Sequence, residues 1–245
     1  MAQAEPLLHY SWDTSLTLNM GNKSELSLSA SGITAFPPMT ECGRDGLCPK
    51  FISGVSFKLP SYKYGELAGL TMSMWIKPSN ESGANARIFE MSNGAKTSTV
   101  AMYRDGSSSR LAFSVSRGGA TKTFVTVEDK TFQANAWKHV AWTLGPTIGS
   151  LRQPSWSIYV DGNLTATVDG FYPEGVVLDS SYIGRAAPAA AAAATGGGGE
   201  TRRQAVASEG QFLGYMDSFM MYPEALSDNE VRLVYLVSGT MYACV

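Results

Sequence analysis

Three cysteines are the residues of this chain whose type and spacing first suggest a chemistry. Cys42 and Cys48 flank the segment Gly-Arg-Asp-Gly-Leu, and its two glycines let a short loop close. We therefore predict a local disulfide between Cys42 and Cys48. Cys244, one residue from the end, is then a buried free thiol, a partner for a segment beyond this chain, or a competitor for one of the other two. The competing interpretation is three reduced, buried thiols.

Three Asn-x-Ser/Thr sequons begin at Asn22, Asn80 and Asn163. Such tripeptides also arise by chance, so their positions carry more weight than their number. Each lies in a predicted turn or loop, where an attached glycan is tolerated. Together with the cysteine pair, they favour a glycoprotein of the secretory pathway, located outside the cell or at its surface.

The N-terminal residues 1–6 have neither the basic segment nor the apolar segment of a signal peptide. If the protein is extracellular, we expect this chain to be a mature fragment or one domain of a larger polypeptide. No run approaches the roughly 18–20 apolar residues of a membrane span. The formal net charge of −2 gives no electrostatic case for nucleic acid or an anionic membrane as partner.

The chain does not carry the residue patterns of the common enzyme classes. It has no Gly-x-Ser-x-Gly, no phosphate-binding loop and no His/Cys nucleophile pair. Glu128 and Asp129 are adjacent, so on a strand they point to opposite faces. His9 and His139 have no acid or cysteine at ligand spacing, which argues against a zinc site. We predict that the chain is not an enzyme and that both histidines pack or form hydrogen bonds within the fold.

The elements that position these residues are mostly strands. The chain has 245 residues, of which 44% are hydrophobic, ample for a core. Apolar side chains recur with period two in many short segments, including 7–12, 51–59, 70–78, 138–144 and 156–160. Asp161-Gly162 lies between two such segments and predicts a hairpin, because a type I′ turn needs two residues with positive φ.

One helix and one insertion interrupt the strand pattern. Ser227 and Glu230 have the spacing of a capping box, and apolar residues follow at helical spacing, so we predict a short helix at about 228–237 and then a final strand. Residues 186–207 are rich in alanine and glycine and predict a low-complexity surface insertion. We expect it to interrupt one domain that comprises residues 1–245.

Four motifs follow one another in the second half of the chain. They are Trp-Lys-His-Val-Ala (137–141), Ile-Tyr-Val-Asp-Gly (158–162), Tyr-Ile-Gly (182–184) and Gly-Tyr-Met-Asp-Ser-Phe (214–219), the last followed by Tyr222, Ala225-Leu226-Ser227 and Glu230. In this order and spacing they resemble the laminin-G-like and pentraxin-like jelly rolls of the concanavalin A type. The resemblance implies an all-β sandwich of two antiparallel sheets, of about six or seven strands each, with one short helix near the C-terminus.

The resemblance also implies a metal. In similar jelly rolls an acid on the last strand and an acid on an early strand hold a structural calcium ion, and Asp217 and Asp13 are the matching residues. Ca²⁺ takes six to eight oxygen ligands, so backbone carbonyls must complete the shell. The chain departs from the family where Ser218 stands in place of a second acid, and where the early segment lacks the usual Gly-Asn-Gly loop.

Members of this family bind glycans, proteins or lipids through loops or the concave sheet, which leads to three hypotheses. The first is an extracellular, non-catalytic, lectin-like module for glycan binding or adhesion. The alternative is a structural protein–protein interaction domain within a larger cell-surface or matrix assembly. The third is an unusual glycosidase, although the paired carboxylates of related glucanases are missing.

The pattern does not single out ligand-binding residues. Aromatic faces suit the apolar face of a sugar, and the chain has five tryptophans. Trp142 and Trp156 lie on apolar strand faces and are interpreted as core. Trp12 and Trp137 are ambiguous, and Trp75, opposite its methionine neighbours, is either on the concave surface or covered by a loop.

Overall fold

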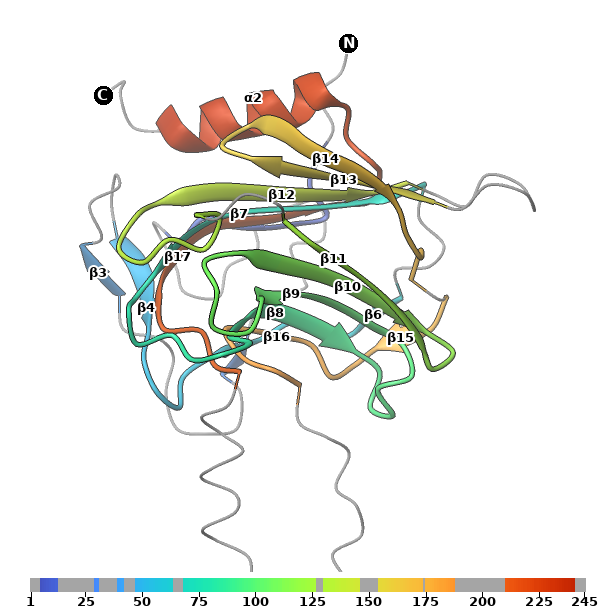
Figure 1. Ribbon diagram of the computed structural model, residues 1–245, viewed down its shortest axis with the longest axis horizontal. Coiled ribbons are helices and arrows are strands. Elements are labelled where there is room, and N and C mark those ends of the chain that lie inside the picture. The colour runs from blue at the N-terminus through green and yellow to red at the C-terminus, as the bar shows by residue number, and fades with distance from the viewer. Residues whose placement is uncertain are drawn as a thin grey trace, which may run out of the picture.

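The computed structural model describes residues 5–12, 29–30, 39–41, 47–63, 68–126, 130–145, 154–173, 175–187 and 210–240. Two antiparallel sheets lie face to face, and one helix lies on the outer side of one sheet (Figure 1). The predicted all-β sandwich of antiparallel sheets, with a helix near the C-terminus, is confirmed. Within the described ranges, no helix is long and apolar enough to cross a membrane.

The first sheet has eight strands, in the order β14-β13-β12-β7-β17-β4-β3, with β1 also paired to β17. Its strands are β1 (Leu8–Tyr10), β3 (Met39–Glu41), β4 (Leu47–Phe51), β7 (Leu70–Pro78), β12 (Lys138–Leu144), β13 (Ser155–Val160), β14 (Asn163–Asp169) and β17 (Gly214–Tyr222). The strand that follows the insertion, β17, therefore lies inside this sheet between β7 and β4.

The second sheet has seven strands, in the order β11-β10-β9-β8-β16-β5-β2. Its strands are β2 (Ser29–Ala30), β5 (Phe57–Lys58), β8 (Arg87–Ser92), β9 (Thr99–Arg104), β10 (Leu111–Arg117), β11 (Ala120–Val125) and β16 (Tyr182–Ile183). A separate pair is formed by β6 (Tyr62–Lys63) and β15 (Val177–Leu178).

The core fills the space between the two sheets. The apolar face predicted for β7 points into it, since Met72, Met74 and Ile76 are fully buried. The Trp142 ring packs edge-on against the Phe113 ring of the other sheet at 5.3 Å between centroids, and against Trp156 at 5.1 Å. Burial of each large apolar side chain is worth about 1.5–3 kcal/mol, so these contacts bind the layers together.

The hairpin between β13 and β14 turns at Asp161 and Gly162, as predicted. Both residues have positive φ, 50° and 74°, which is the conformation of a type I′ turn. The Asp161 carboxylate also accepts hydrogen bonds from Lys138 Nζ at 2.6 Å and from the His139 backbone N–H at 3.1 Å. The turn is therefore tied back to the start of β12.

A β-bulge interrupts the alternation of β17. Its pairing with β7 shifts register between Asp217 and Met220, where Ser218 has a φ of 51°. The extra residue lets Met216 and Phe219, three positions apart, both face the core. Asp217 consequently lies on the outer face of the sheet, opposite Trp75 in the register.

Helix α2 (Asp228–Thr240) covers that outer face of the first sheet (Figure 1). The capping box is confirmed, because the Glu230 carboxylate accepts hydrogen bonds from the Ser227 backbone N–H at 2.8 Å and the Ser227 hydroxyl at 2.7 Å. The apolar side of the helix joins a second buried cluster, made of Ala141, Tyr159, Met220, Tyr222, Leu226, Val231 and Val234.

Three predicted boundaries need correction. The helix does not end at 237 but continues through Ser238 to Thr240, so the final strand cannot begin before residue 241, outside the described residues. Residues 51–59 do not form one strand, because a turn at Ser53 and Gly54 separates β4 from β5. Ala187, placed in the insertion, is buried at 3% exposure and belongs to the packed part of the fold. Most of the predicted insertion, from 188 onward, lies outside the described residues.

Candidate functional site

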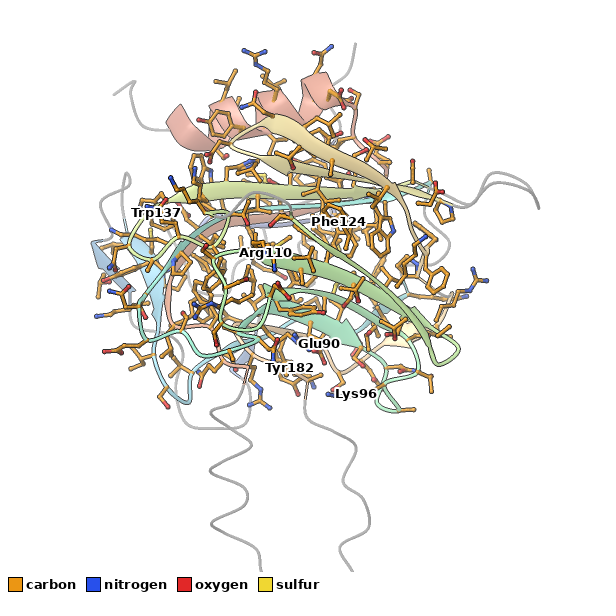
Figure 2. The ribbon with its side chains drawn as sticks, in the orientation of Figure 1. Glu90, Lys96, Arg110, Phe124, Trp137 and Tyr182 are labelled. Atoms are coloured by element: carbon orange, nitrogen blue, oxygen red, sulfur yellow. The ribbon has the colours of Figure 1, made fainter. Side chains whose placement is uncertain are left out.

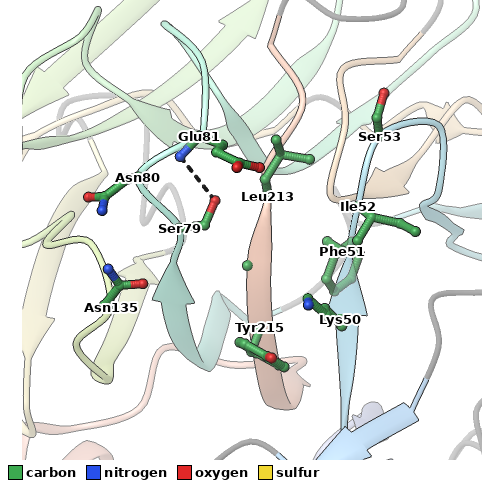
Figure 3. Close-up of a pocket in the computed structure, with 11 residues that line it drawn as sticks. Lys50, Phe51, Ile52, Ser53, Ser79, Asn80, Glu81, Asn135, Leu213 and Tyr215 are labelled. Atoms are coloured by element: carbon green, nitrogen blue, oxygen red, sulfur yellow. Dashed lines mark hydrogen bonds between the residues drawn. The ribbon is translucent and has the colours of Figure 1, made fainter.

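A pocket of about 430 Å³ opens at one end of the first sheet, where β4, β7 and β17 meet. Figure 3 shows the start of β17 between two walls. The lining residues are Lys50, Phe51, Ile52, Ser53, Ser79, Asn80, Glu81, Asn135, Leu213, Gly214 and Tyr215. The volume fits one or a few small rings, and the lining mixes an aromatic ring with amides, hydroxyls and two charges.

One wall is the turn after β4, and Gln211 holds it. The Gln211 side chain is 5% exposed and donates from Nε2 to the backbone carbonyls of Ile52 at 2.9 Å and Val55 at 3.0 Å. Its Oε1 accepts from the Gly54 backbone N–H at 3.0 Å. A single buried amide thus forms hydrogen bonds with three backbone groups of a turn that lies between strands and outside the sheet ladders.

The opposite wall is the segment after β7, and Ser82 holds it. The buried Ser82 hydroxyl donates to the Leu213 carbonyl at 2.6 Å and accepts from the Leu213 backbone N–H at 3.1 Å. Asn135 adds to this wall, and its backbone N–H donates to the Pro78 carbonyl at 2.7 Å. Both walls are therefore fixed to the strand that forms the floor, so the pocket exists before any ligand enters.

The floor requires a glycine. Gly214 has a φ of 135°, and a Cβ there would meet the Lys77 carbonyl oxygen at 2.3 Å and the Pro78 Cα at 2.9 Å. Backbone atoms cannot move aside as a flexible side chain would, so no other residue fits without opening the sheet.

A row of side chains extends from the pocket across the outer face of the first sheet. Lys50, Tyr215 and Lys77 are register neighbours on β4, β17 and β7, and Trp137 immediately precedes β12. Lys50 Nζ lies 5.8 Å and Lys77 Nζ 5.6 Å from the Tyr215 ring centroid, and Lys77 Nζ lies 6.0 Å from the Trp137 ring. We call these four residues the aromatic–lysine row.

Helix α2 decides which aromatic side chains remain accessible. It covers Trp75, whose ring stacks on Tyr235 at 5.4 Å and whose Nε1 donates to the Ser238 hydroxyl at 2.9 Å. Tyr215 and Trp137, one row further along, are only half-buried. Figure 2 labels Trp137 at the start of β12. The aromatic–lysine row is therefore an aromatic surface of the first sheet that the helix leaves accessible.

Of the two predicted calcium ligands, Asp217 lies within the described part of the chain. Asp217 is 4% exposed and has a weak contact of 3.4 Å with the Ser218 hydroxyl. A buried carboxylate beside a bulge is a reasonable oxygen donor, but Asp13 lies outside the described residues. No group of three possible His, Cys, Asp or Glu ligands occurs among the residues that are described. The pairing of Asp13 with Asp217 stays a prediction.

The cysteine and sequon predictions fall partly outside the described ranges. Cys48 is fully buried in β4, opposite Thr40 of β3, while Cys42 and Cys244 are not described. The Cys42–Cys48 disulfide stays a prediction, as does glycosylation at Asn22, also outside those ranges. Asn80 and Asn163 are both exposed, and Asn80 lines the pocket.

Both histidines and the remaining tryptophans lie within the packed fold. His139 is fully buried, its Nε2 lies 2.8 Å from the Ser73 hydroxyl, and His9 is half-buried on β1. The side chains of Trp12, Trp142 and Trp156 are in the core at 2% exposure or less. Tyr215 was missed at the sequence level. The period-two alternation of β17 indicates its position, because it places Tyr215 on the face opposite the core residue Met216.

The outer face of the second sheet carries a different group of charges. Glu90, labelled with Lys96 in Figure 2, accepts hydrogen bonds from Arg87 Nε at 2.9 Å and the Ala187 backbone N–H at 3.2 Å, and forms an ion pair of 3.4 Å with Lys96. The carboxylate is 5% exposed and fully occupied by these partners. These interactions connect Ala187, in the segment after β16, to β8.

Residues 54–232 match the laminin G member of the family described as the concanavalin A-like lectin/glucanases superfamily. The chain belongs to that superfamily. No curated protein sequence matches the chain.

Similar solved structures share the fold at low sequence identity. Domain 4 of AbnA, a GH43 extracellular arabinanase from Geobacillus stearothermophilus in complex with arabinotriose, has a TM-score of 0.68 at 14% identity, covering 96% of this chain and 100% of that one. The CBM40 of the Ruminococcus gnavus IT-sialidase, bound to alpha2,3 sialyllactose, has a TM-score of 0.51 at 14% identity, covering 82% and 100%. The binding domain of Paraclostridial Mosquitocidal Protein 1 has a TM-score of 0.59 at 15% identity, covering 95% of this chain and 52% of that one. At these identities the similarity establishes the fold and not the ligand.

Proposed function

We propose that this chain is a non-catalytic, lectin-like recognition module that binds a glycan in the pocket between β4, β7 and β17. The observation that carries the proposal is the preformed pocket with Tyr215 at its floor and the exposed amides of Asn80 and Asn135 on one wall. An aromatic face takes the apolar face of a sugar ring, and amides both donate to and accept from its hydroxyl groups. The arabinotriose and sialyllactose complexes of two similar folds support the same class of ligand.

The proposal is tested with a glycan array and a matched pair of variants. Loss of the Tyr215 ring should weaken binding of the array hits by about thirtyfold, because truncation of an aromatic anchor at a binding site costs about 2 kcal/mol. Tyr215→Phe keeps the ring and should retain most of the affinity, whereas Tyr215→Ala should not. Tyr182→Ala, on the second sheet, is the control. Full binding by Tyr215→Ala would show that the ligand lies elsewhere.

The non-catalytic part of the proposal rests on the carboxylates at the pocket. Glycoside hydrolysis uses two carboxyl groups on either side of the bond that breaks. Among the lining residues only Glu81 carries one, and the outer-face Glu90 is engaged by Arg87 and Lys96. Hydrolysis of a β-glucan that is abolished by Glu81→Gln would replace the recognition module by a glycosidase.

We propose an extracellular or cell-surface location. The exposed sequon asparagine Asn163 supports it, because a glycan attached there would extend into solvent and away from the pocket. Expression in a glycosylating secretory host, followed by enzymatic deglycosylation, should show a mass loss. That loss should be reduced in Asn163→Gln.

The alternative function, a structural domain that contacts protein, has one specific observation in its favour. Leu233, Leu236 and Val237 of α2 are 38–48% exposed and lie at i, i+3 and i+4, on one side of the helix. Silence on the glycan array, together with a partner whose capture is lost in Leu233→Glu, would favour this alternative over sugar binding.

A further inference from the structure

We propose that the glycan bound by this chain is acidic, and that Lys50 holds its negative group at the Tyr215 end of the pocket while Lys77 supports it from the other side of the ring. The inference rests on the proposed function and specifies the class of sugar.

The first observation is the sheet register. Tyr215 of β17 is paired with Lys50 of β4 on one side and with Lys77 of β7 on the other. Residues in register lie on the same face, so the two lysines flank the tyrosine with their Cα atoms about 10 Å apart, which is two inter-strand spacings. A sugar ring stacked on Tyr215 therefore has an ammonium group on either side.

The second observation is the direction of the lysine side chains. Both Nζ atoms lie within 6 Å of the Tyr215 centroid, at 5.8 Å and 5.6 Å, rather than extending away from the surface. A ring attracts a cation by about 0.5–1 kcal/mol at an exposed site, enough to bias the side chains toward it. The charges are thus concentrated at the place where the sugar would stack.

The third observation is the distribution of acids. Glu81, the acidic residue among those lining the pocket, lies at the opposite end from Tyr215 in Figure 3. Asp217 shares the outer face with Tyr215 but is one row further along β17 and is 4% exposed. Lys50 is exposed, lines the pocket and forms no ion pair within the described part of the chain. Among the described residues, the Tyr215 end of the pocket is consequently the positive end.

A positive end selects a negative ligand group. Carboxylate and sulfate both form charge-assisted hydrogen bonds with an ammonium group, and a neutral sugar gains nothing from the charge. Because Lys50 and Lys77 are near the surface, the attraction is screened by salt. The shared chemistry is therefore an acidic saccharide, either a uronic acid or a sulfated sugar.

The experiment uses two matched pairs of probes on the intact chain. Polygalacturonate and its methyl ester differ in a carboxylate charge, and dextran sulfate and dextran differ in sulfate groups. The charged member of one pair should bind at least about tenfold more tightly at 50 mM salt, and the preference should mostly disappear at 500 mM. The pair of probes that shows the preference identifies whether the chain recognises a carboxylate or a sulfate group.

The variants assign the preference to the row. Lys50→Ala should remove most of it and Lys77→Ala a smaller part, while Lys50→Arg should keep it because the charge remains. Lys122→Ala on β11 removes the same charge from the second sheet and should leave the preference unchanged. Circular dichroism of each variant confirms that it is folded.

Two results overturn the inference in distinguishable ways. If charged and neutral probes bind equally and binding is still lost in Tyr215→Ala, the ligand is a neutral glycan and the proposed function stands. If Lys122→Ala reduces the preference as much as Lys50→Ala, the attraction is a general property of the surface. Failure of every glycan to bind would instead remove the proposed function itself.

Discussion

Replacement of Gln211 by methionine should loosen one wall of the pocket without creating a cavity. Met is close to Gln in volume but keeps none of its three hydrogen bonds to the turn at 52–55. Each such bond contributes about 0.5–1.5 kcal/mol. The buried Val55 carbonyl loses its Gln211 donor, whereas the Ile52 carbonyl keeps its bond from the Val55 backbone N–H. The three together predict a loss of about 3 kcal/mol in the free energy of unfolding.

Thermal and urea denaturation followed by circular dichroism measure that loss. For a chain of this length, 1 kcal/mol corresponds to about 2–4 °C, so the melting temperature of Gln211→Met should fall by about 6–12 °C. Ser53→Ala, an exposed residue of the same turn, is the control and should change stability by less than about 0.5 kcal/mol. The array hits should also bind Gln211→Met less tightly, because the wall must be ordered again on binding.

The outcome that would refute this reasoning is equal stability of Gln211→Met and Ser53→Ala. It would mean that water replaces the buried amide at no cost, and that the wall does not depend on Gln211. A stability loss with unchanged glycan affinity would instead show that the turn does not contribute to the ligand site.

Three further predictions concern the helix and the metal. Ser227 holds the pKa of Glu230 below its usual value through a side-chain and a backbone hydrogen bond. The stabilisation is therefore present above the usual pKa of a glutamate and is lost as the pH falls through the lowered pKa of Glu230. Glu230→Gln should be less stable than the wild type by about 1 kcal/mol or less at pH 7, and the two should become equally stable in acid. Burial, and after it the hydrogen bond to Asp228, raises the pKa of Tyr159 from 10.0 to about 12. The stabilisation is therefore fully present below pH 10 and is lost as the pH rises through 12. In an alkaline denaturation series, the free energy of unfolding of Tyr159→Phe should fall less than that of the wild type over this range. If Asp13 and Asp217 bind calcium, a chelator should lower the melting temperature of the wild type and not that of Asp217→Asn. An equal response of the wild type and Asp217→Asn would show that these two residues do not form a calcium site.

Local patterns were enough to predict most of the scaffold. Positive φ at both Asp161 and Gly162 follows from the turn that two residues must make between paired strands. The burial of Trp142 and Trp156 follows from strict alternation on strands with one face inward. In each case the responsible interactions are between residues near in sequence or on one strand, so they can be read without the fold.

The accessible aromatic surface could not be found in the same way. Trp75 and Trp137 both border the outer face of the first sheet, yet Trp75 is covered by α2 and Trp137 is only half-buried. The difference depends on the last turn of the helix, which brings Ser238 to the Trp75 indole from 163 residues away. No local pattern encodes where a helix will lie on a distant sheet face.

The sequence by itself determined the strands, the tight turn, the helix cap and the superfamily, because backbone propensity and side-chain alternation act over a few residues. Only the tertiary structure brought Lys50, Lys77 and Tyr215 into one row and fixed the pocket walls through Gln211 and Ser82. These contacts join segments more than a hundred residues apart or depend on which strands become neighbours. The cost of closing such loops is met by burial of the whole core, so the site is a property of the assembled sandwich and not of any of its segments.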